Sequence, residues 1–281
     1  MLITSSIPIL RSAINKLKQQ GRSIGFVPTM GALHEGHATL LRRSVRDNDA
    51  TVLSIFVNPA QFSPQEDFRR YPRTQKKDVL LAKKTNVDII FYPSVVGMYP
   101  AGFSTRVQVD GLSEGLCGAL RPGHFRGVAT VVAKLLNIVT PDVLYLGQKD
   151  AQQCAVIRRM VDDLNFPVRV QIEPTVRESD GLAMSSRNRY LTPNQRQKAT
   201  GLYAALKAAR AQIRAGERRA SRIKALVREM LRRTSGRIDY VECVDAKNLK
   251  PCSSLQGDIL IAVAVWFGRA RLIDNIIVRI L

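Results

Sequence analysis

Residues 25–37 read GFVPTMGALHEGH, and this segment decides how the fold is interpreted. Its apolar start is typical of a short buried strand, and it follows an amphipathic helix predicted over 7–20 that ends at Gly21. Gly31 favours a tight turn, and the H-x-G-H that follows it lies at the start of a helix predicted over 37–46. A strand, a turn and a helix in succession form the first unit of an alternating α/β fold.

The same alternation continues through residues 1–175. Further strands are predicted at 51–58, 87–93, 142–147 and 168–176, with a short one at 104–110, and further helices at 76–85, 126–139 and 150–164. The predicted strands are nearly continuous apolar runs, which is typical of strands covered on both faces. We therefore expect a doubly wound (Rossmann-like) parallel sheet, which binds ligands at the carboxyl ends of its strands near a topological switch point.

Residues 176–281 follow a different pattern. Thr192 to Gln195 has the form of a capping box with proline at the first helical position, and amphipathic helices follow. Three strands are predicted last, at 239–245, 258–267 and 270–278. This order predicts a smaller C-terminal α+β lid domain with a short antiparallel sheet, so the expected domains are 1–175 and 176–281.

The composition excludes several classes of protein. Apolar residues make up 45% of the 281 residues, which is enough for a large core. No run approaches the roughly 18 apolar residues of a membrane-spanning helix, and the N-terminus does not have the pattern of a signal peptide. The four cysteines form no C-x-x-C pair, which argues against a disulfide framework or a zinc site. A cytoplasmic protein without a membrane-spanning helix is expected.

The chain is strongly basic, with 43 Lys and Arg against 23 Asp and Glu, a net charge of +20. Residues 196–237 alone contain 13 basic and two acidic residues. Such a region is compatible with nucleic-acid binding or with a solvated helix surface. It does not have the interleaved aromatic residues on which single strands stack, so the solvated surface is favoured and nucleic acid is not an expected partner.

Two of the three histidines, His34 and His37, lie three residues apart at the expected helix start. On one helical turn their imidazoles face the same way, beside the free N–H groups and partial positive charge of a helix N-terminus. Gly36 would let a ligand approach the backbone. This arrangement suits a phosphate and the charge that develops on it during transfer. The alternatives are a metal pair, for which only His124 remains as a third histidine, and two incidental surface histidines.

Seven segments extend the pattern beyond the histidine pair. They are VPTMGALHEGH (27–37), SIFVNPAQF (54–62), DFRRYPRT (67–74), RPGHFRGV (121–128), LGQKDAQQ (146–153), DGLAMSSRNRYL (180–191) and ARLIDN (270–275). On these segments the whole chain resembles the pantothenate synthetase (pantoate–beta-alanine ligase) family, within the superfamily of H-x-G-H nucleotidylyltransferases and class I aminoacyl-tRNA synthetases. One departure is Gln148, where many relatives have glutamate, and we expect it to have little consequence.

The resemblance implies a two-step reaction. ATP adenylates the carboxylate of pantoate with release of pyrophosphate, and the amine of beta-alanine then attacks the pantoyl adenylate to give pantothenate and AMP. Mg²⁺ is implied as the companion of the ATP phosphates, although no carboxylate cluster indicates a dedicated metal site. The family also suggests a homodimer. Catalysis is expected to rest on positioning and electrostatics.

The resemblance assigns roles to individual residues. His37 is the implied catalytic residue, assisted by His34 and Lys149. The implied ATP-binding residues are Met30, Gly31, Ala32, Leu33, His34, Glu35, Gly36, His37, Gly147, Gln148, Lys149, Asp150, Val176, Met184, Ser185, Ser186 and Arg187. The implied binders of pantoate and beta-alanine are Gln61, Gln153 and, as a weaker candidate, Asn58.

The chemistry of these residue types is compatible with the assignment. The hydroxyls and guanidinium of residues 184–187 suit phosphate oxygens, although a polar interdomain loop is the alternative. Lys149 offers a cation, and Asp150 either accepts from ribose hydroxyls or caps a helix. The neutral amides of Gln61 and Gln153 suit a hydroxy acid, because they both donate and accept.

Two questions stay open from the sequence. Residues 121–128, with His124, either attract a substrate carboxylate or serve packing or a dimer contact. The function alternatives are another adenylyl- or nucleotidylyltransferase, and a nucleic-acid-binding protein on an inactive synthetase fold. The long matches argue against the first, and the intact H-x-G-H, GQKD and MSSR motifs argue against the second.

Overall fold

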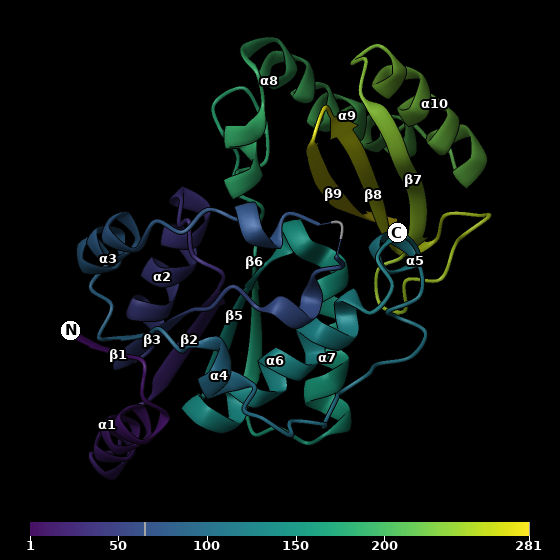
Figure 1. The fold of residues 1–281 in the computed structure, drawn as a ribbon. Coiled ribbons are helices and arrows are strands. Elements are labelled where there is room, and N and C mark those ends of the chain that lie inside the picture. Colours follow the sequence, from purple (N-terminus) through teal and green to yellow (C-terminus); the bar gives the residue numbers. More distant parts are fainter. Residues whose placement is uncertain (65, 281) are drawn as a thin grey trace.

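The computed structural model places a large and a small β-sheet one above the other (Figure 1). It describes residues 1–64 and 66–280. The large sheet has six parallel strands, and the small sheet has three antiparallel strands. The expected combination of a doubly wound parallel sheet with a smaller antiparallel one is confirmed.

The strand order of the large sheet creates a switch point at its centre. Its strands are β1 (Leu2–Thr4), β2 (Ile24–Thr29), β3 (Ala50–Ile55), β4 (Ile89–Phe91), β5 (Val143–Gly147) and β6 (Arg169–Glu173). They lie in the order β1-β4-β3-β2-β5-β6, so the chain moves outward from β2 on one side and resumes with β5 on the other. A ligand site is expected at the carboxyl ends of β2 and β5, where the order reverses.

Helices cover both faces of the large sheet. One face carries α1 (Ile7–Gln19), α6 (His124–Val139) and α7 (Ala151–Asp163), and the other carries α2 (Glu35–Asp47) and α3 (Gln75–Lys84). Successive side chains of a strand point to opposite faces, so Phe26 and Leu144 pack in the first layer while Val27 and Tyr145 pack in the second. Burial on both faces explains why these strands are continuous apolar runs.

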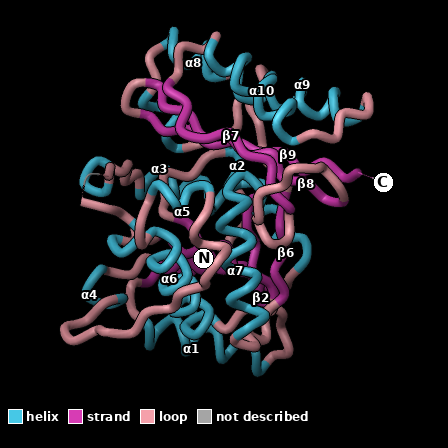
Figure 2. Tube along the Cα trace, turned by 90° about the vertical axis from the view of Figure 1, so that its right-hand side faces the viewer, coloured by secondary structure: helices cyan, strands magenta, loops and turns pink. Residues whose placement is uncertain are grey.

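The small sheet lies between its own helices and the large-sheet half of the molecule (Figures 1 and 2). Its elements are α8 (Pro193–Ala199), α9 (Gly201–Arg214), α10 (Ala220–Arg232), β7 (Arg237–Asp245), β8 (Gly257–Phe267) and β9 (Ala270–Ile280). In β8, Ile261 and Val263 pack with the C-terminal helices, whereas Leu260 and Ala262 pack into the core of the large-sheet half. The alternating side chains of β8 therefore contribute to two cores.

Short helical turns complete the chain. They are η1 (Pro59–Gln61), η2 (Phe68–Arg70), α4 (Val95–Met98), α5 (Leu116–Leu120), η3 (Gln148–Asp150) and η4 (Ser186–Tyr190). Within the described residues, no helix has the length and apolar character needed to cross a membrane.

The predicted strands agree with the structure except at two places, and among the helices the short α4 and α5 were not predicted. The strand predicted at 104–110 is wrong, because this segment runs as a loop whose Val107 bonds to the Thr130 side chain of α6. The edge strand β1 was not predicted, because its three residues are too few to show a period. The capping box of α8 is confirmed, with Thr192 and Gln195 each accepting from the other's backbone N–H.

Candidate active site

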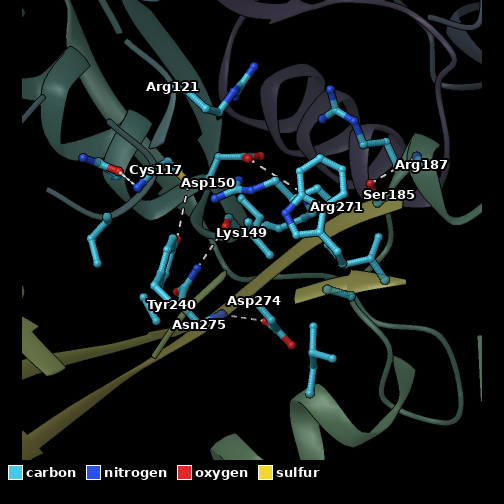
Figure 3. Close-up of a pocket in the computed structure, with 18 of the residues that line it drawn as sticks. Cys117, Arg121, Lys149, Asp150, Ser185, Arg187, Tyr240, Arg271, Asp274 and Asn275 are labelled. Carbon is cyan, nitrogen blue, oxygen red and sulfur yellow. Dashed lines mark hydrogen bonds and ion pairs between the residues drawn. The ribbon is translucent and has the colours of Figure 1, made fainter. Parts of the chain in front are cut away.

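Two neighbouring cavities lie at the carboxyl edge of the large sheet. The histidine cavity, about 230 Å³, is lined by both H-x-G-H histidines. The inter-sheet cavity, about 820 Å³, reaches the small sheet and is lined there by Tyr240 and Arg271 (Figure 3). Both cavities are lined by Arg121, His124, Lys149, Asp150, Gln153, Ser185 and Arg187. The two cavities therefore meet at these side chains.

The histidines of H-x-G-H cap the helix that they begin. His34 is the N-cap of α2, and its Nδ1 accepts from the Gly36 N–H at 3.2 Å. His37 Nδ1 accepts in turn from the His34 N–H at 3.3 Å, and the ring centroids are 4.1 Å apart. The imidazoles lie together as expected, but the expectation of free N–H groups is wrong for His34 and Gly36. A Cβ at Gly36 would lie 2.9 Å from His34 Cε1, so this glycine makes room for the ring, and it also lines the histidine cavity.

The capping bonds and burial fix the protonation of both rings. Because each Nδ1 accepts, the proton of each neutral imidazole is on Nε2. Burial lowers the pKa of His34 to about 4, and the nearby Lys149 cation acts in the same direction. Burial is the main reason that the pKa of His37 lies well below 6.5, and the nearby His34 and Lys149 lower it further. At neutral pH both rings are therefore uncharged and keep an Nε2–H that the capping bonds do not use.

A buried carboxylate shapes the loop before the histidines. Asp78 of α3 accepts from the N–H groups of Ala32 (3.1 Å) and Leu33 (2.8 Å) and from the Thr74 hydroxyl (3.0 Å). The loop turns through positive φ at Gly31 (83°) and Ala32 (50°). Asp78 therefore sets the path by which the chain leaves β2 and reaches α2.

Gln61 ends the turn after β3, and Asn58 orients its amide. Asn58 Nδ2 donates to Gln61 Oε1 (3.0 Å) and to the Gly127 carbonyl (3.1 Å). Asn58 Oδ1 accepts from the Ala60 N–H (3.2 Å) and the Tyr99 hydroxyl (2.7 Å). These four bonds use the full capacity of the Asn58 amide, which is 1% exposed. Asn58 is therefore placed to act on a substrate only through Gln61.

The MSSR loop bonds to the segment that follows η1. Arg187 donates from Nε to Asp67 Oδ2 (3.1 Å) and from Nη2 to Asp67 Oδ1 (2.9 Å). The Ser186 hydroxyl lies 3.2 Å from the Tyr71 hydroxyl, whose pKa is raised by burial. The guanidinium expected to bind phosphate thus holds a carboxylate of the same chain.

The loop after β5 is tied to strand β9. Gln148 Nε2 donates to Asn275 Oδ1 (3.2 Å), and Asn275 Nδ2 donates to the Gln148 carbonyl (3.0 Å). Asn275 Nδ2 also donates to the Lys149 carbonyl (2.9 Å), and the two residues lie side by side in Figure 3. Beside it, Arg177 forms a two-point ion pair with Asp274 at 2.6 and 2.9 Å. The bonds of Asn275 connect the small sheet to the loop that carries Lys149, and the Arg177–Asp274 pair connects it to the segment after β6.

The structure gathers most of the residues assigned by resemblance. The ATP-binding candidates that line a cavity are Met30, His34, Gly36, His37, Gly147, Lys149, Asp150, Val176, Met184, Ser185, Ser186 and Arg187. Gln61, Gln153 and Asn58 also line the histidine cavity. The candidates that line neither cavity are Gly31, Ala32, Leu33, Glu35 and Gln148. Of these, Glu35 is exposed and pairs with Arg42, and Gln148 pairs with Asn275.

Several contributors were not singled out from the sequence, among them Asp67, Tyr71 and Asp78. Asp67 and Tyr71 lie in the quoted segment 67–74, but no spacing distinguishes them from its other polar residues. Asp78 had a weak signal, since it is an acid on the same helical face as the buried Ala82.

The metal-pair alternative for the histidines is not supported. Among the described residues, His, Cys, Asp and Glu form no group of three or more that would hold a metal ion. The third histidine, His124, bonds instead to Arg121 and to the Gln61 carbonyl.

The family model described as pantoate–beta-alanine ligase matches residues 2–277. The chain belongs to the pantoate–beta-alanine ligase family. The pantothenate synthetase of Moorella thermoacetica is 53% identical to it over 281 residues, which is 100% of this chain and 99% of that relative. The resemblance inferred from the seven segments, and the enzyme class, are confirmed.

Solved structures of the pantoate–beta-alanine ligase family share this fold. Pantothenate synthetase from Thermus thermophilus superposes with a TM-score of 0.94 at 48% identity, covering 98% of this chain and 99% of that one. The ligase from Francisella tularensis, complexed with beta-gamma ATP and beta-alanine, gives a TM-score of 0.80 at 35% identity and covers 98% and 97% of the two chains.

Proposed function

We propose that the chain condenses pantoate with beta-alanine to give pantothenate, AMP and pyrophosphate, through a pantoyl adenylate. The observation that supports this most directly is the convergence of two neutral imidazoles, Lys149 and two glutamine amides on one cavity. The Francisella relative was solved with beta-gamma ATP and beta-alanine, and we extend both ligands to this site.

Pantoate binds in the histidine cavity against Gln61 and Gln153. Both side chains line this cavity, and a neutral amide can donate to the carboxylate and accept from the hydroxyls of a hydroxy acid. Asn58 serves as a positioning residue, because its own bonds all go to protein atoms.

In the first step a pantoate carboxylate oxygen attacks the α-phosphorus of ATP, and the bond to the β-phosphate oxygen breaks to release pyrophosphate. Negative charge grows on the phosphoryl oxygens, and the Nε2–H groups of His34 and His37 donate to it. Lys149 supplies a cation, and the hydroxyls of Ser185 and Ser186 with Arg187 hold the outer phosphates.

In the second step the amine of beta-alanine attacks the acyl carbon of the adenylate. The acyl–oxygen bond breaks, AMP leaves with the bonding electron pair, and the amine nitrogen gives its extra proton to solvent as the amide forms. This chemistry needs no covalent enzyme intermediate. The contribution of the protein is to hold the reactants in line and to stabilise charge.

Mg²⁺ fits this site as a companion of ATP rather than as a resident metal. Asp150 is a partly exposed carboxylate that lines both cavities, and it would supply an oxygen ligand. Both oxygens of Asp78 already accept from the N–H groups of Ala32 and Leu33, so this carboxylate is not offered to a metal ion. We therefore propose that the phosphates hold most of the ion and that its charge offsets theirs.

We further propose that residues 1–175 and 176–281 act as two domains and that the enzyme is a cytoplasmic homodimer. The separate apolar cluster formed by the small sheet with α9 and α10 supports the division. Light scattering during gel filtration tests the dimer, since a molar mass equal to one chain of 31.3 kDa would refute it.

Release of AMP from ATP and Mg²⁺ with pantoate, with and without beta-alanine, tests the reaction. The proposal expects sustained AMP release only with both substrates, together with one pantothenate per AMP by mass spectrometry. Exchange of labelled pyrophosphate into ATP that depends on pantoate alone would demonstrate the adenylate. Absence of any ATP turnover that pantoate stimulates would refute the substrate assignment.

A further inference from the structure

His124 holds the main chain of Gln61, whereas Asn58 holds its side chain. His124 Nδ1 lies 2.8 Å from the Gln61 carbonyl oxygen, and its Nε2 lies 2.9 Å from Arg121 Nη1. Arg121 reaches the same carbonyl at 3.4 Å and forms a two-point ion pair with Glu66 at 2.6 and 2.8 Å. A chain of bonds thus runs from Glu66 through Arg121 and His124 to Gln61.

The partners of His124 define its tautomer and leave it no free polar atom. A carbonyl oxygen can only accept, so Nδ1 carries the proton, and a guanidinium can only donate, so Nε2 accepts. Burial, with the Arg121 cation, lowers the pKa of His124 to about 4, and the ring is therefore neutral at physiological pH. His124 lines both cavities but has no donor or acceptor left for a substrate.

The N-terminal end of helix α6, which carries His124, packs directly against the backbone at Gln61. A Cβ at Gly127 would lie 2.7 Å from the Gln61 backbone nitrogen and closer still to the Ala60 carbonyl oxygen. The Gly127 carbonyl also accepts from Asn58, which orients the Gln61 amide. The first turn of α6 therefore sets the backbone of Gln61 and, through Asn58, one side of its amide, while Gln61 Nε2 donates to Met30 Sδ at 3.0 Å.

We propose that His124 is a positioning residue that sets the pantoate-binding amide of Gln61, and that Glu66 and Arg121 hold His124 in the required tautomer. The inference rests on the proposed role of Gln61 in binding pantoate. It gives Arg121 and His124 of the open segment 121–128 a part in substrate affinity, although both act only through contacts with other protein atoms.

A pair of conservative substitutions separates the two bonds of His124. In His124→Asn the side-chain amide reaches the position of Nδ1 and keeps a donor for the Gln61 carbonyl. In His124→Gln it reaches the position of Nε2 and keeps an acceptor for Arg121 instead. We expect His124→Gln to raise the KM for pantoate by about tenfold. We expect kcat and the KM for ATP to stay within about twofold, and His124→Asn to stay close to the native enzyme.

A double-mutant cycle with Gln61→Ala tests whether His124 acts through Gln61. In that background, His124→Gln is expected to add no further change in the KM for pantoate. Arg126→Gln is the matched control, because Arg126 is an exposed cation on the same turn that lines neither cavity. If His124→Gln does not fold, as thermal melting would show, Glu66→Gln tests the same chain of bonds and should raise the KM for pantoate by a smaller factor.

Three results would overturn the inference. They are a fall in kcat without a change in the KM for pantoate, an equal rise in the KM for ATP, and a full effect of His124→Gln in the Gln61→Ala background. If Gln61→Ala alone leaves the KM for pantoate unchanged, the role proposed for Gln61 fails, and this outcome is distinct from a failure of His124.

Discussion

Asp67 holds the guanidinium of Arg187 through two parallel hydrogen bonds of 3.1 and 2.9 Å. This two-point geometry is the one that arginine uses for a phosphate as well as for a carboxylate. Because Arg187 lies in the loop that we propose receives the triphosphate, we expect Asp67 and ATP to compete for the same donors. The structure shows this arginine bound to a carboxylate, which we propose a phosphate replaces when ATP binds.

Asp67→Asn removes the competing charge and should strengthen ATP binding. An amide keeps one acceptor for Arg187 but loses the ionic attraction, so we expect the Kd for ATP to fall by about threefold to tenfold. Isothermal titration with ATP and Mg²⁺, without pantoate, measures this Kd. Asp258→Asn is the matched control, because it breaks a pair of the same geometry with Arg279 on the exposed part of β8 and β9. An unchanged or weaker Kd in Asp67→Asn would rule out competition.

His37→Asn separates capping from catalysis. The asparagine oxygen can take the place of Nδ1 and accept from the His34 N–H, whereas the Nε2–H donor is lost. We expect adenylate formation to slow by about 100-fold or more, with little change in melting temperature or in the KM for pantoate. Rapid-quench measurement of pantoyl adenylate gives the rate. Adenylate formation at the native rate would remove His37 from the mechanism.

His34 makes stability depend on pH in the acid range. The pKa of His34 is about 4 in the folded protein and 6.5 when unperturbed, so the unfolded chain binds the proton first as pH falls. The contribution of neutral His34 to the free energy of unfolding is complete above pH 6.5. It is lost progressively between pH 6.5 and 4, and the total loss is about 2 kcal/mol after allowance for the partial exposure of the ring. Urea unfolding of His34→Asn, which retains a capping oxygen but does not titrate there, should show a flatter dependence. Equal slopes in both proteins would contradict the shift.

The fold was predictable because the signal of each layer lies within a short segment. Strands such as β3 and β5 are continuous apolar runs, whereas apolar residues recur about every 3.6 residues in the helices between them. The type and the order of these elements therefore follow from the local sequence pattern. Strand β1 cannot be predicted from the sequence, because three residues are too few to show a period. The alternation of polar and apolar residues at 104–110 predicts a strand, but within the described part of the chain this loop pairs with no strand.

The site was predictable in its members but not in its contacts. The spacing of His34 and His37 indicates a shared helical turn, but it does not reveal that each Nδ1 faces a backbone N–H, because this depends on side-chain rotamers. The pair of Asp67 and Arg187 joins residues 120 positions apart, and the pair of Gln148 and Asn275 joins residues 127 positions apart. Such contacts arise from tertiary packing, for which a single sequence has no local signal.

Asn275 is the main link between the small sheet and the Lys149 loop, which leads to a last prediction. Its amide donates to the carbonyls of Gln148 and Lys149 and accepts from the Gln148 side chain, at 5% exposure. Asn275→Asp keeps the shape but turns a carboxylate oxygen toward two carbonyl oxygens. We expect the free energy of unfolding to fall by about 2–3 kcal/mol, because buried acceptors lose their donor.

The same substitution should raise the KM for ATP, since the loop that carries Lys149 loses its anchor on β9. Urea unfolding and steady-state kinetics measure the two effects. Asn248→Asp is the matched control, because exposed Asn248 uses only its Oδ1, as an acceptor for the Lys250 N–H, and aspartate keeps that bond. If Asn275→Asp were as stable and active as Asn248→Asp, the contact with β9 would have no part in placing Lys149.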